Sequence, residues 1–147
     1  METTITYKPE LIAVKNAAKN LEDVALVTPL MRSVRYSREF HANILLKRED
    51  LQVVRSYKIR GAYNKMVSLT EVQIENVVVC ASAGNHAQGV ALSCKLLKIK
   101  GKIYMPSPTP KQKIDKVRMF GEEYIDIVLV GDSYDDAYLK AILECER

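Results

Sequence analysis

The sequence predicts an α/β protein with an open, mostly parallel β-sheet that carries helices on both faces. Continuous β-branched runs, such as VVVCAS at 77–82, are typical of strands that are covered on both faces. Strand and helix patterns alternate four times, and their short connections suit right-handed βαβ units. The chain has 147 residues, of which 48% are hydrophobic, so it suits one domain with a real core.

The first part of the chain contains two predicted helices and one predicted strand. A helix is expected over 9–20, behind a proline, with an apolar stripe formed by Leu11, Val14, Ala18 and Leu21. NILLKRED at 43–50 begins as a short buried strand and ends in charged residues. A second helix is expected within 56–69, with an apolar stripe formed by Ile59, Ala62, Tyr63, Met66 and Leu69.

The second part of the chain repeats the order of strand and helix. The strand at 77–82 precedes a helix with the apolar stripe Ala87, Val90, Ala91, Cys94 and Leu97. A strand at 102–106 leads to a helix with predicted signals at both ends. Thr109 is expected as the N-cap, Pro110 as the first helical residue and Gln112 as the partner in a capping box, and Gly121 is expected to end the helix. The last strand, 124–131, precedes a helix with a second capping box formed by Ser133 and Asp136.

The composition argues against several classes of protein. The chain has 22 Lys+Arg and 18 Asp+Glu, and the basic residues are scattered, which argues against nucleic-acid binding. It shows no charged leader and no apolar run near the roughly 20 residues of a membrane span, so we expect a cytoplasmic protein. The three cysteines lack C-x-x-C spacing and are expected in the core: Cys80, Cys94 and Cys145. Neither His41 nor His86 has a cysteine or carboxylate nearby at the spacing of metal ligands.

The segment ASAGNHAQG at 81–89 is a candidate anion-binding loop. It places Ser82, Gly84, Asn85 and His86 at the junction of a predicted strand and a predicted helix. Gly84 would permit close backbone approach, and free N–H groups at the helix start can hold a carboxylate or a phosphate. The alternative interpretation is a plain turn in which Asn85 caps the helix.

The segment SYKIRGAY at 56–63 places Lys58 and Arg60 where a helix is expected to begin. Cations there oppose the helix dipole, although most such pairs belong to an ordinary solvated helix surface. A lysine near an anion-binding loop suits a Schiff-base site better than a hydrolase, because no Gly-x-Ser-x-Gly motif is present.

Five segments in this order and spacing resemble the N-terminal half of threonine dehydratase (threonine ammonia-lyase). They are TPL at 28–30, KREDLQ at 47–52, SYKIRGAYN at 56–64, SAGNHAQGVA at 82–91 and MPSPTPKQKI at 105–114. Threonine dehydratases are pyridoxal 5'-phosphate enzymes of fold type II, whose fold is like that of the tryptophan synthase β subunit. The resemblance covers most of residues 28–121.

The resemblance implies a role for each matching residue. Lys58 would carry the cofactor as a Schiff base and act as the general base, and Asn85 would hydrogen-bond the 3′ oxygen of the cofactor. Arg60 would either contribute a neutralising field or form a structural ion pair. The substrate carboxylate would lie on the backbone of Ser82, Ala83, Gly84, Asn85 and His86. The reaction would convert L-threonine, with L-serine as a second substrate, into an oxo acid and ammonia. From threonine the oxo acid would be 2-oxobutanoate, which is used for isoleucine synthesis.

The match also has departures. Tyr57 stands where the family usually has phenylalanine. The glycine-rich phosphate loop of the family, and the later serine or cysteine that faces the pyridine nitrogen, have no counterpart in the 147 residues. We therefore expect an incomplete fold, with 1–45 as the N-terminal segment of the large domain and 46–147 as the small α/β domain. Such a chain should have negligible turnover, and the full-length protein should be a homo-oligomer.

Two further hypotheses stay open. A serine racemase or a catabolic serine/threonine dehydratase would share the lysine and asparagine motifs, although KREDLQ at 47–52 favours the biosynthetic threonine enzyme. A protein of another class would be a catalytically silent α/β fragment that binds a partner chain through an uncovered sheet edge.

Overall fold

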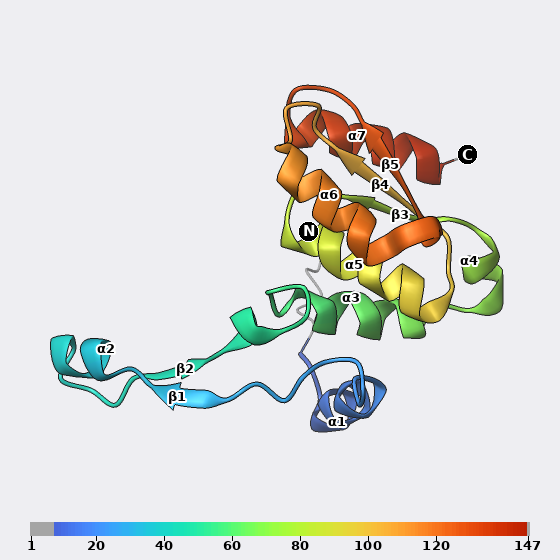
Figure 1. The fold of residues 1–147 in the computed structure, drawn as a ribbon. Coiled ribbons are helices and arrows are strands. Elements are labelled where there is room, and N and C mark those ends of the chain that lie inside the picture. Colours follow the sequence, from blue (N-terminus) through green and yellow to red (C-terminus); the bar gives the residue numbers. More distant parts are fainter. Residues whose placement is uncertain (1–7, 147) are drawn as a thin grey trace, which may run out of the picture.

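A three-stranded parallel sheet forms the centre of the molecule, in a computed structural model that describes residues 8–146 (Figure 1). Its strands are β3 (Val78–Ala81), β4 (Gly101–Met105) and β5 (Ile125–Leu129), in the spatial order β3-β4-β5. The register pairs Val78 with Gly101 and Gly101 with Ile125. The predicted parallel sheet is therefore confirmed.

Helices cover both faces of this sheet, as predicted (Figure 1). Helix α7 (Tyr134–Cys145) packs on one face, and α5 (Asn85–Leu97) and α6 (Lys111–Gly121) pack on the other. Strand β4 shows why both faces are apolar. Its residues alternate between the two sides, with Ile103 and Met105 in the core under α5 and α6, and Tyr104 in the core under α7.

Helix α3 (Lys58–Val67) lies against the outer side of α5. It buries Ile59, Ala62 and Met66, three members of the predicted stripe, whereas Tyr63 and Leu69 are partly exposed. Helix α5 buries Ala87, Val90, Ala91 and Cys94, as its pattern predicts. The structure thus consists of a sheet with one helix on one face and two layers of helices on the other.

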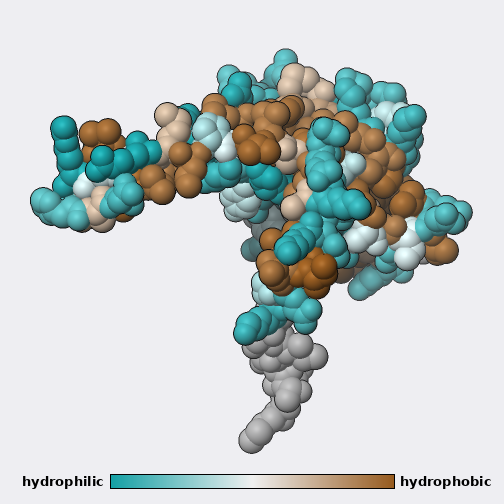
Figure 2. All heavy atoms as spheres, turned by 90° about the horizontal axis from the view of Figure 1, so that it is seen from below, coloured by the Kyte–Doolittle hydropathy of each residue, from teal (hydrophilic) through white to brown (hydrophobic). Residues whose placement is uncertain are grey.

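An arm projects from this body and contains a two-stranded antiparallel sheet (Figure 1). Strand β1 (Leu30–Arg32) pairs with β2 (Leu45–Lys47), and α2 (Val34–Glu39) lies between them in the sequence, with Ser33 as its N-cap. Hydrophobic residues are visible along the arm (Figure 2). The prediction of a buried strand at 43–50 is wrong, because β2 pairs with β1 among the described residues and all three of its residues are exposed.

Helix α1 (Leu11–Asn20) confirms a helix in the predicted place but not its buried stripe. None of its residues is buried, and Leu11 and Val14 are exposed. Of the predicted stripe only Leu21, just after the helix, is buried. Residues 1–7 of the predicted N-terminal segment, and Arg147 of the last predicted helix, lie outside the described residues.

The helix ends test the capping predictions. Ser133 and Asp136 form the predicted capping box of α7, and α6 ends at Gly121 as predicted. The predicted cap at Thr109 is wrong, and so are Pro110 as the first helical residue and Gln112 as part of a capping box. Pro110 is instead the N-cap of α6, and no described side chain caps the helix. The backbone N–H of Thr109 instead donates to the Pro106 carbonyl at 3.0 Å, which turns its side chain into the interior, where Oγ1 is buried without a hydrogen bond.

Three short helical segments complete the described chain. A 3₁₀ turn covers Glu49–Leu51, another covers Glu122–Tyr124, and α4 (Glu71–Glu75) carries an unpredicted capping box. The cysteine prediction is right for Cys80 and Cys94, which are buried, and wrong for Cys145. Cys145, in the last turn of α7, is exposed because it lines the open cavity beside β3.

Candidate functional site

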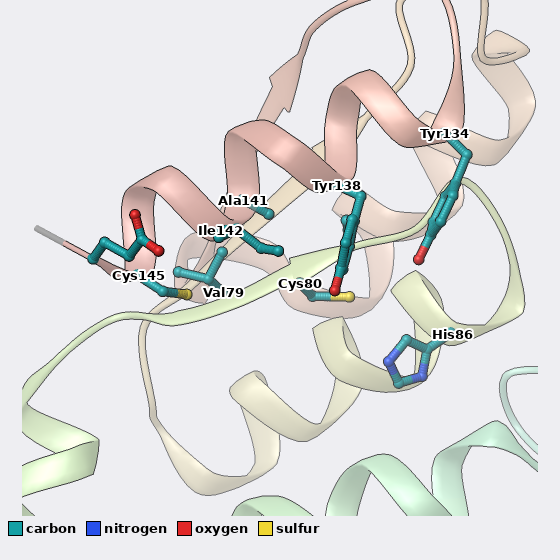
Figure 3. Close-up of a pocket in the computed structure, with 10 residues that line it drawn as sticks. Val79, Cys80, His86, Tyr134, Tyr138, Ala141, Ile142 and Cys145 are labelled. Carbon is teal, nitrogen blue, oxygen red and sulfur yellow. The ribbon is translucent and has the colours of Figure 1, made fainter. Parts of the chain in front are cut away.

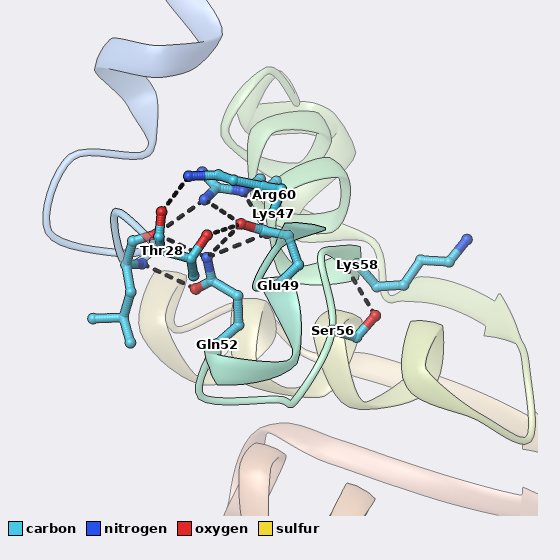
Figure 4. A network of polar contacts seen from close by, with 8 residues as sticks. Thr28, Lys47, Glu49, Gln52, Ser56, Lys58 and Arg60 are labelled. Carbon is cyan, nitrogen blue, oxygen red and sulfur yellow. Dashed lines mark hydrogen bonds and ion pairs between the residues drawn. The ribbon is translucent and has the colours of Figure 1, made fainter. Parts of the chain in front are cut away.

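Lys58 is the first residue of α3, where the sequence places it. Its backbone N–H donates to Ser56 Oγ at 3.3 Å, and its ammonium lies 5.3 Å from the centroid of the Tyr57 ring. The side chain is half-buried and points away from the polar residues on the other side of α3 (Figure 4). Among residues 8–146, its amine has no hydrogen-bond or ion-pair partner, so no salt bridge holds it.

The predicted anion-binding loop joins β3 to α5. The Ser82 N–H donates to the Tyr104 carbonyl at 3.0 Å, which fixes the loop to β4, and Ser82 Oγ accepts from the Gly84 N–H at 3.3 Å. Gly84 is the N-cap of α5 and provides no side chain to cap it. Asn85 is the first helical residue and is exposed. The alternative in which Asn85 caps the helix is therefore wrong.

The start of α5 can accept an anion because its first backbone N–H groups are not capped by a side chain. Ala83 and Gly84, in the loop before it, are half-buried, and His86 is exposed. Neighbouring protein atoms lower the pKa of His86 below its usual 6.5 by desolvation, and the charge of Lys58 lowers it further. Lys58 and the loop thus interact electrostatically.

The packing of α3 on α5 brings these segments together. The backbone of Lys58 lies directly against Gly89, which is on α5 one turn after Asn85. One helical turn rises about 5.4 Å, so Asn85 lies about one turn from the contact between Gly89 and Lys58. The two predicted site segments, 56–64 and 82–91, therefore meet at one end of the α3–α5 pair.

A polar network on the opposite side of α3 explains the second cation of SYKIRGAY (Figure 4). Arg60 donates to both carboxylate oxygens of Glu49, through Nε at 2.8 Å and Nη2 at 2.9 Å, and Nη2 also donates to the Leu26 carbonyl at 2.9 Å. Thr28 Oγ1 donates to Glu49 at 2.5 Å. Of the two roles considered for Arg60, the structural ion pair is the one observed.

The electrostatics of Glu49 follow from these contacts. The hydrogen bonds from Arg60 lower the pKa of Glu49 to about 2, with smaller contributions from Thr28 and Gln52, while burial opposes the shift. Only 17% of the Glu49 side chain is exposed. The carboxylate is therefore held in its charged form by donors from three segments of the chain.

Gln52 completes this network. Its amide NH₂ donates to the Leu26 carbonyl at 2.8 Å, and its Oε1 accepts from the Leu26 N–H at 2.9 Å. Gln52 is 1% exposed, and Lys47 donates to the Thr28 carbonyl at 2.5 Å. KREDLQ is therefore more than surface ion pairs, although Arg48 and Asp50 do form one at 2.7 Å.

Sequence reasoning missed this network because a run of charged residues is usually solvated. The sequence offered one signal for such a network, the mixed composition of 47–52. There Glu49 and Gln52 stand three residues apart, just before the segment that contains Lys58. Gln52 and Arg60 both bond to Leu26, which is distant in the sequence, so no local pattern predicts these contacts.

A cavity of about 310 Å³ lies beside β3 and α7 (Figure 3). It is mostly apolar and is lined by Cys80, Ala81, His86, Tyr134 and Tyr138, among others. The two tyrosine rings stack with centroids 6.0 Å apart. Of the predicted site residues only His86 lines this cavity, so the cavity is a neighbour of the lysine site and not its container.

No helix within residues 8–146 is long and apolar enough to cross a membrane. No three His, Cys, Asp or Glu side chains of those residues gather in a way that could hold a metal ion. The arrangement that the structure does offer is an unpaired amine beside an uncapped helix start.

The chain matches a known protein family over most of its length. The model of the family described as "Pyridoxal-phosphate dependent enzyme" matches residues 21–146. The match includes Lys58, the loop at 82–86 and the whole parallel sheet.

Curated relatives are biosynthetic enzymes. L-threonine dehydratase biosynthetic IlvA of Bacillus subtilis is 59% identical over 139 residues, which are 92% of this chain and 33% of the relative. The enzyme of the same name from Mycobacterium tuberculosis is 48% identical over 134 residues, which are 91% of this chain and 31% of the relative. The chain spans about a third of the length of these relatives.

Solved structures have the same arrangement of elements. The processed form of threonine deaminase isoform 2 from Solanum lycopersicum superposes with a TM-score of 0.79 at 39% identity, over 94% of this chain and 41% of that one. Maize serine racemase superposes with a TM-score of 0.83 at 28% identity, over 95% of this chain and 42% of that one. The described fold is therefore part of a larger fold in these proteins.

Proposed function

The chain belongs to the family of pyridoxal-phosphate dependent enzymes, and from this premise we propose that it supplies the cofactor-binding lysine and the substrate-binding loop of a threonine dehydratase. The observation that carries the proposal is the free amine of Lys58 at the first residue of α3, beside the uncapped start of α5. The identity of 59% with a biosynthetic threonine dehydratase supports the choice of reaction.

The residues present fit a cofactor that carries an aldehyde. A Schiff base needs an accessible amine without a competing salt bridge, and Lys58 meets this condition among the described residues. The exposed amide of Asn85 provides a donor for an oxygen on the cofactor ring. The nearby carboxylate of Glu49 does not compete for the lysine, because Arg60, Thr28 and Gln52 occupy it.

Each residue then has a distinct task. Backbone N–H groups of 82–86 hold the substrate carboxylate, and Lys58 Nζ takes the proton from the substrate Cα as general base. Pyridoxal phosphate, when bound, supplies an electron sink for the negative charge left at that carbon. His86 stays mainly neutral at pH 7 because its pKa is lowered by desolvation and by Lys58, so it does not compete as a cation for the carboxylate.

L-threonine is the proposed substrate, with L-serine as a second one, and the products from threonine are 2-oxobutanoate and ammonia. A serine racemase is the second candidate, favoured by the superposition on maize serine racemase. Turnover of the two amino acids by a full-length protein containing this chain distinguishes the candidates. Faster ammonia release from threonine supports the dehydratase, and inversion of L-serine supports the racemase.

The proposed division of the chain places 1–45 with a larger domain and 46–147 in the small α/β domain. The exposed apolar residues of the arm and the unburied helix α1 support this division. The rest of the proposed catalytic site would come from sequence that the longer relatives possess, and we propose that the full-length enzyme is a cytoplasmic homo-oligomer. The 147 residues alone should give negligible 2-oxobutanoate with threonine and excess cofactor, and appreciable product would contradict this.

The decisive experiment for the site is chemical trapping. The chain is incubated with pyridoxal phosphate, reduced with borohydride and mapped by mass spectrometry. We expect the pyridoxyl group mainly on Lys58, and a Lys58→Ala variant should lose it while Lys65→Ala, on the same helix, should not. Labelling spread evenly over many lysines would refute the proposal and would support a silent fragment that binds a partner chain.

A further inference from the structure

Gly89 occupies a position where a side chain would not fit without movement. It is buried in the interior of α5, and a Cβ built there would lie 3.1 Å from both the carbonyl carbon and the carbonyl oxygen of Lys58. The same Cβ would lie 3.3 Å from the backbone nitrogen of Ile59. These neighbours are backbone atoms of the first turn of α3, so they can yield only if that turn moves.

Glycine in a helix interior is unfavourable for the helix itself, so a buried one calls for a packing reason. Contact with α3 provides the reason here. Gly61 offers the opposite case, since it lies on the exposed side of α3 and a Cβ there would have nothing within 4 Å. Two glycines on the paired helices thus differ in whether a methyl group would touch Lys58.

The position of Gly89 connects this contact with the loop. Asn85 and Gly89 are four residues apart and therefore lie on the same side of α5. A contact at Gly89 consequently fixes how closely Lys58 approaches the residues one turn earlier. The other face of the first turn is held by Arg60 and its partners, so a side chain at position 89 would push α3 against that network.

We propose that Gly89 is a positioning residue whose missing side chain lets Lys58 lie against the start of α5, in reach of Asn85. This inference rests on the proposed function for the role of Lys58, and it adds a residue that determines where the reactive amine lies. Gly89 touches neither substrate nor cofactor in this assignment. It acts through the backbone of Lys58.

The test compares Gly89→Ala and Gly89→Val with Gly61→Ala in the borohydride trapping experiment. The readout is the pyridoxyl on Lys58 relative to Lys65, which lies on the same helix and serves as an internal reference. A shift of a few tenths of an ångström should lower this ratio about threefold for alanine, and the larger valine should lower it about tenfold or more. Gly61→Ala should leave the ratio unchanged.

A second control separates positioning from loss of stability. Met66→Ala removes buried side-chain atoms near the far end of α3 without touching Lys58. Met66→Ala should lower the thermal midpoint and keep the labelling ratio. Gly89→Ala should lower the thermal midpoint less, because alanine at 89 gains helix propensity. An unchanged ratio in Gly89→Val, or an equal loss in Met66→Ala, would overturn the inference.

A cofactor-free measurement keeps the inference testable if trapping fails. NMR titration measures the pKa of His86 in each variant. The pKa should rise in Gly89→Val, because Lys58 is displaced, and it should stay unchanged in Gly61→Ala. Even labelling of the parent chain together with the expected His86 change would refute the proposed function and retain the positioning role. If Lys58 is labelled preferentially in the parent chain and Gly89→Val changes nothing, the proposed function is retained and the positioning role of Gly89 is refuted.

Discussion

The first turn of α3 is held from two sides by different physical means. On one side Arg60 donates three charge-assisted hydrogen bonds, two to Glu49 and one to Leu26, within a network that Gln52 and Thr28 complete. On the other side the backbone of Lys58 lies against Gly89 without any polar contact between them. The polar side depends on charge and therefore on pH, whereas the packed side depends only on shape.

This difference suggests how a reactive lysine can be held without being neutralised. A carboxylate close to Lys58 would hold it by a salt bridge and compete with the Schiff base. Here the carboxylate holds Arg60, two residues further along the helix, and leaves the Lys58 amine free among the described residues. Position is supplied by the neighbours of Lys58, and the amine keeps its reactivity.

The largest expected effect comes from breaking the polar side. Arg60→Met should lower the free energy of unfolding by about 2 kcal/mol, because it leaves the mostly buried Glu49 carboxylate without its main partner. Arg48→Met removes an ion pair of similar length between exposed residues and should leave the denaturation midpoint unchanged. Urea denaturation of the two variants compares them directly. Equal midpoints would show that the Glu49 network contributes no more than a surface pair.

The next effect concerns acid stability. The pKa of Glu49 falls from 4.5 to about 2 in the folded chain, chiefly through its hydrogen bonds with Arg60. The unfolded chain therefore binds the proton more readily, and the stabilisation is full above pH 4.5 and lost as the pH falls toward 2. By linkage it amounts to about 1–2 kcal/mol once solvent screening of this partly exposed pair is allowed for.

The measurement is the free energy of unfolding of the parent and of Glu49→Gln between those pH values. The variant should be less stable than the parent at neutral pH, and the difference should shrink as the pH falls. Subtraction of the two curves removes the contribution of other carboxylates, such as Asp136, whose pKa is lowered mainly by hydrogen bonding from Ser133. A constant difference across the range would contradict the assigned role of Glu49.

The smallest effect is spectroscopic and reports on the packed side. Lys58→Ala should raise the pKa of His86 toward its usual value, because one of the two causes that lower it disappears while desolvation remains. The chain has two histidines, so an NMR titration can follow His86 with His41 as its internal control. An unchanged pKa of His86 would mean that the lysine amine does not lie near the start of α5.

The sequence predicts the elements whose pattern is local. The βαβ order, the stripes of α3 and α5 and the Ser133–Asp136 cap all follow from neighbouring residues, and the structure confirms them. The arm fails this test because Leu45 and Leu46 have the composition of a buried strand but lie exposed against β1 alone. Burial depends on what covers a strand, which its own residues do not encode.

The same distinction applies to the candidate site. Lys58 and the loop at 82–86 could be proposed as site residues because their motifs are short and contiguous, and their roles stay predictions. Their adjacency depends on the packing of two helices, which is visible only in the contact of Gly89 with Lys58. Glu49 was missed for a related reason, since a glutamate within a charged run gives no sign that a distant arginine and a distant threonine will donate hydrogen bonds to it.

The strand order β3-β4-β5 also bears on how the chain acquires its structure. Each strand is added beside its predecessor, so no strand has to be inserted between two that already pair. The connecting loops and helices are short, which keeps the entropy cost of closing each βαβ unit small. We expect the sheet to form progressively during synthesis on the ribosome, with the first βαβ unit acting as the template for the next strand.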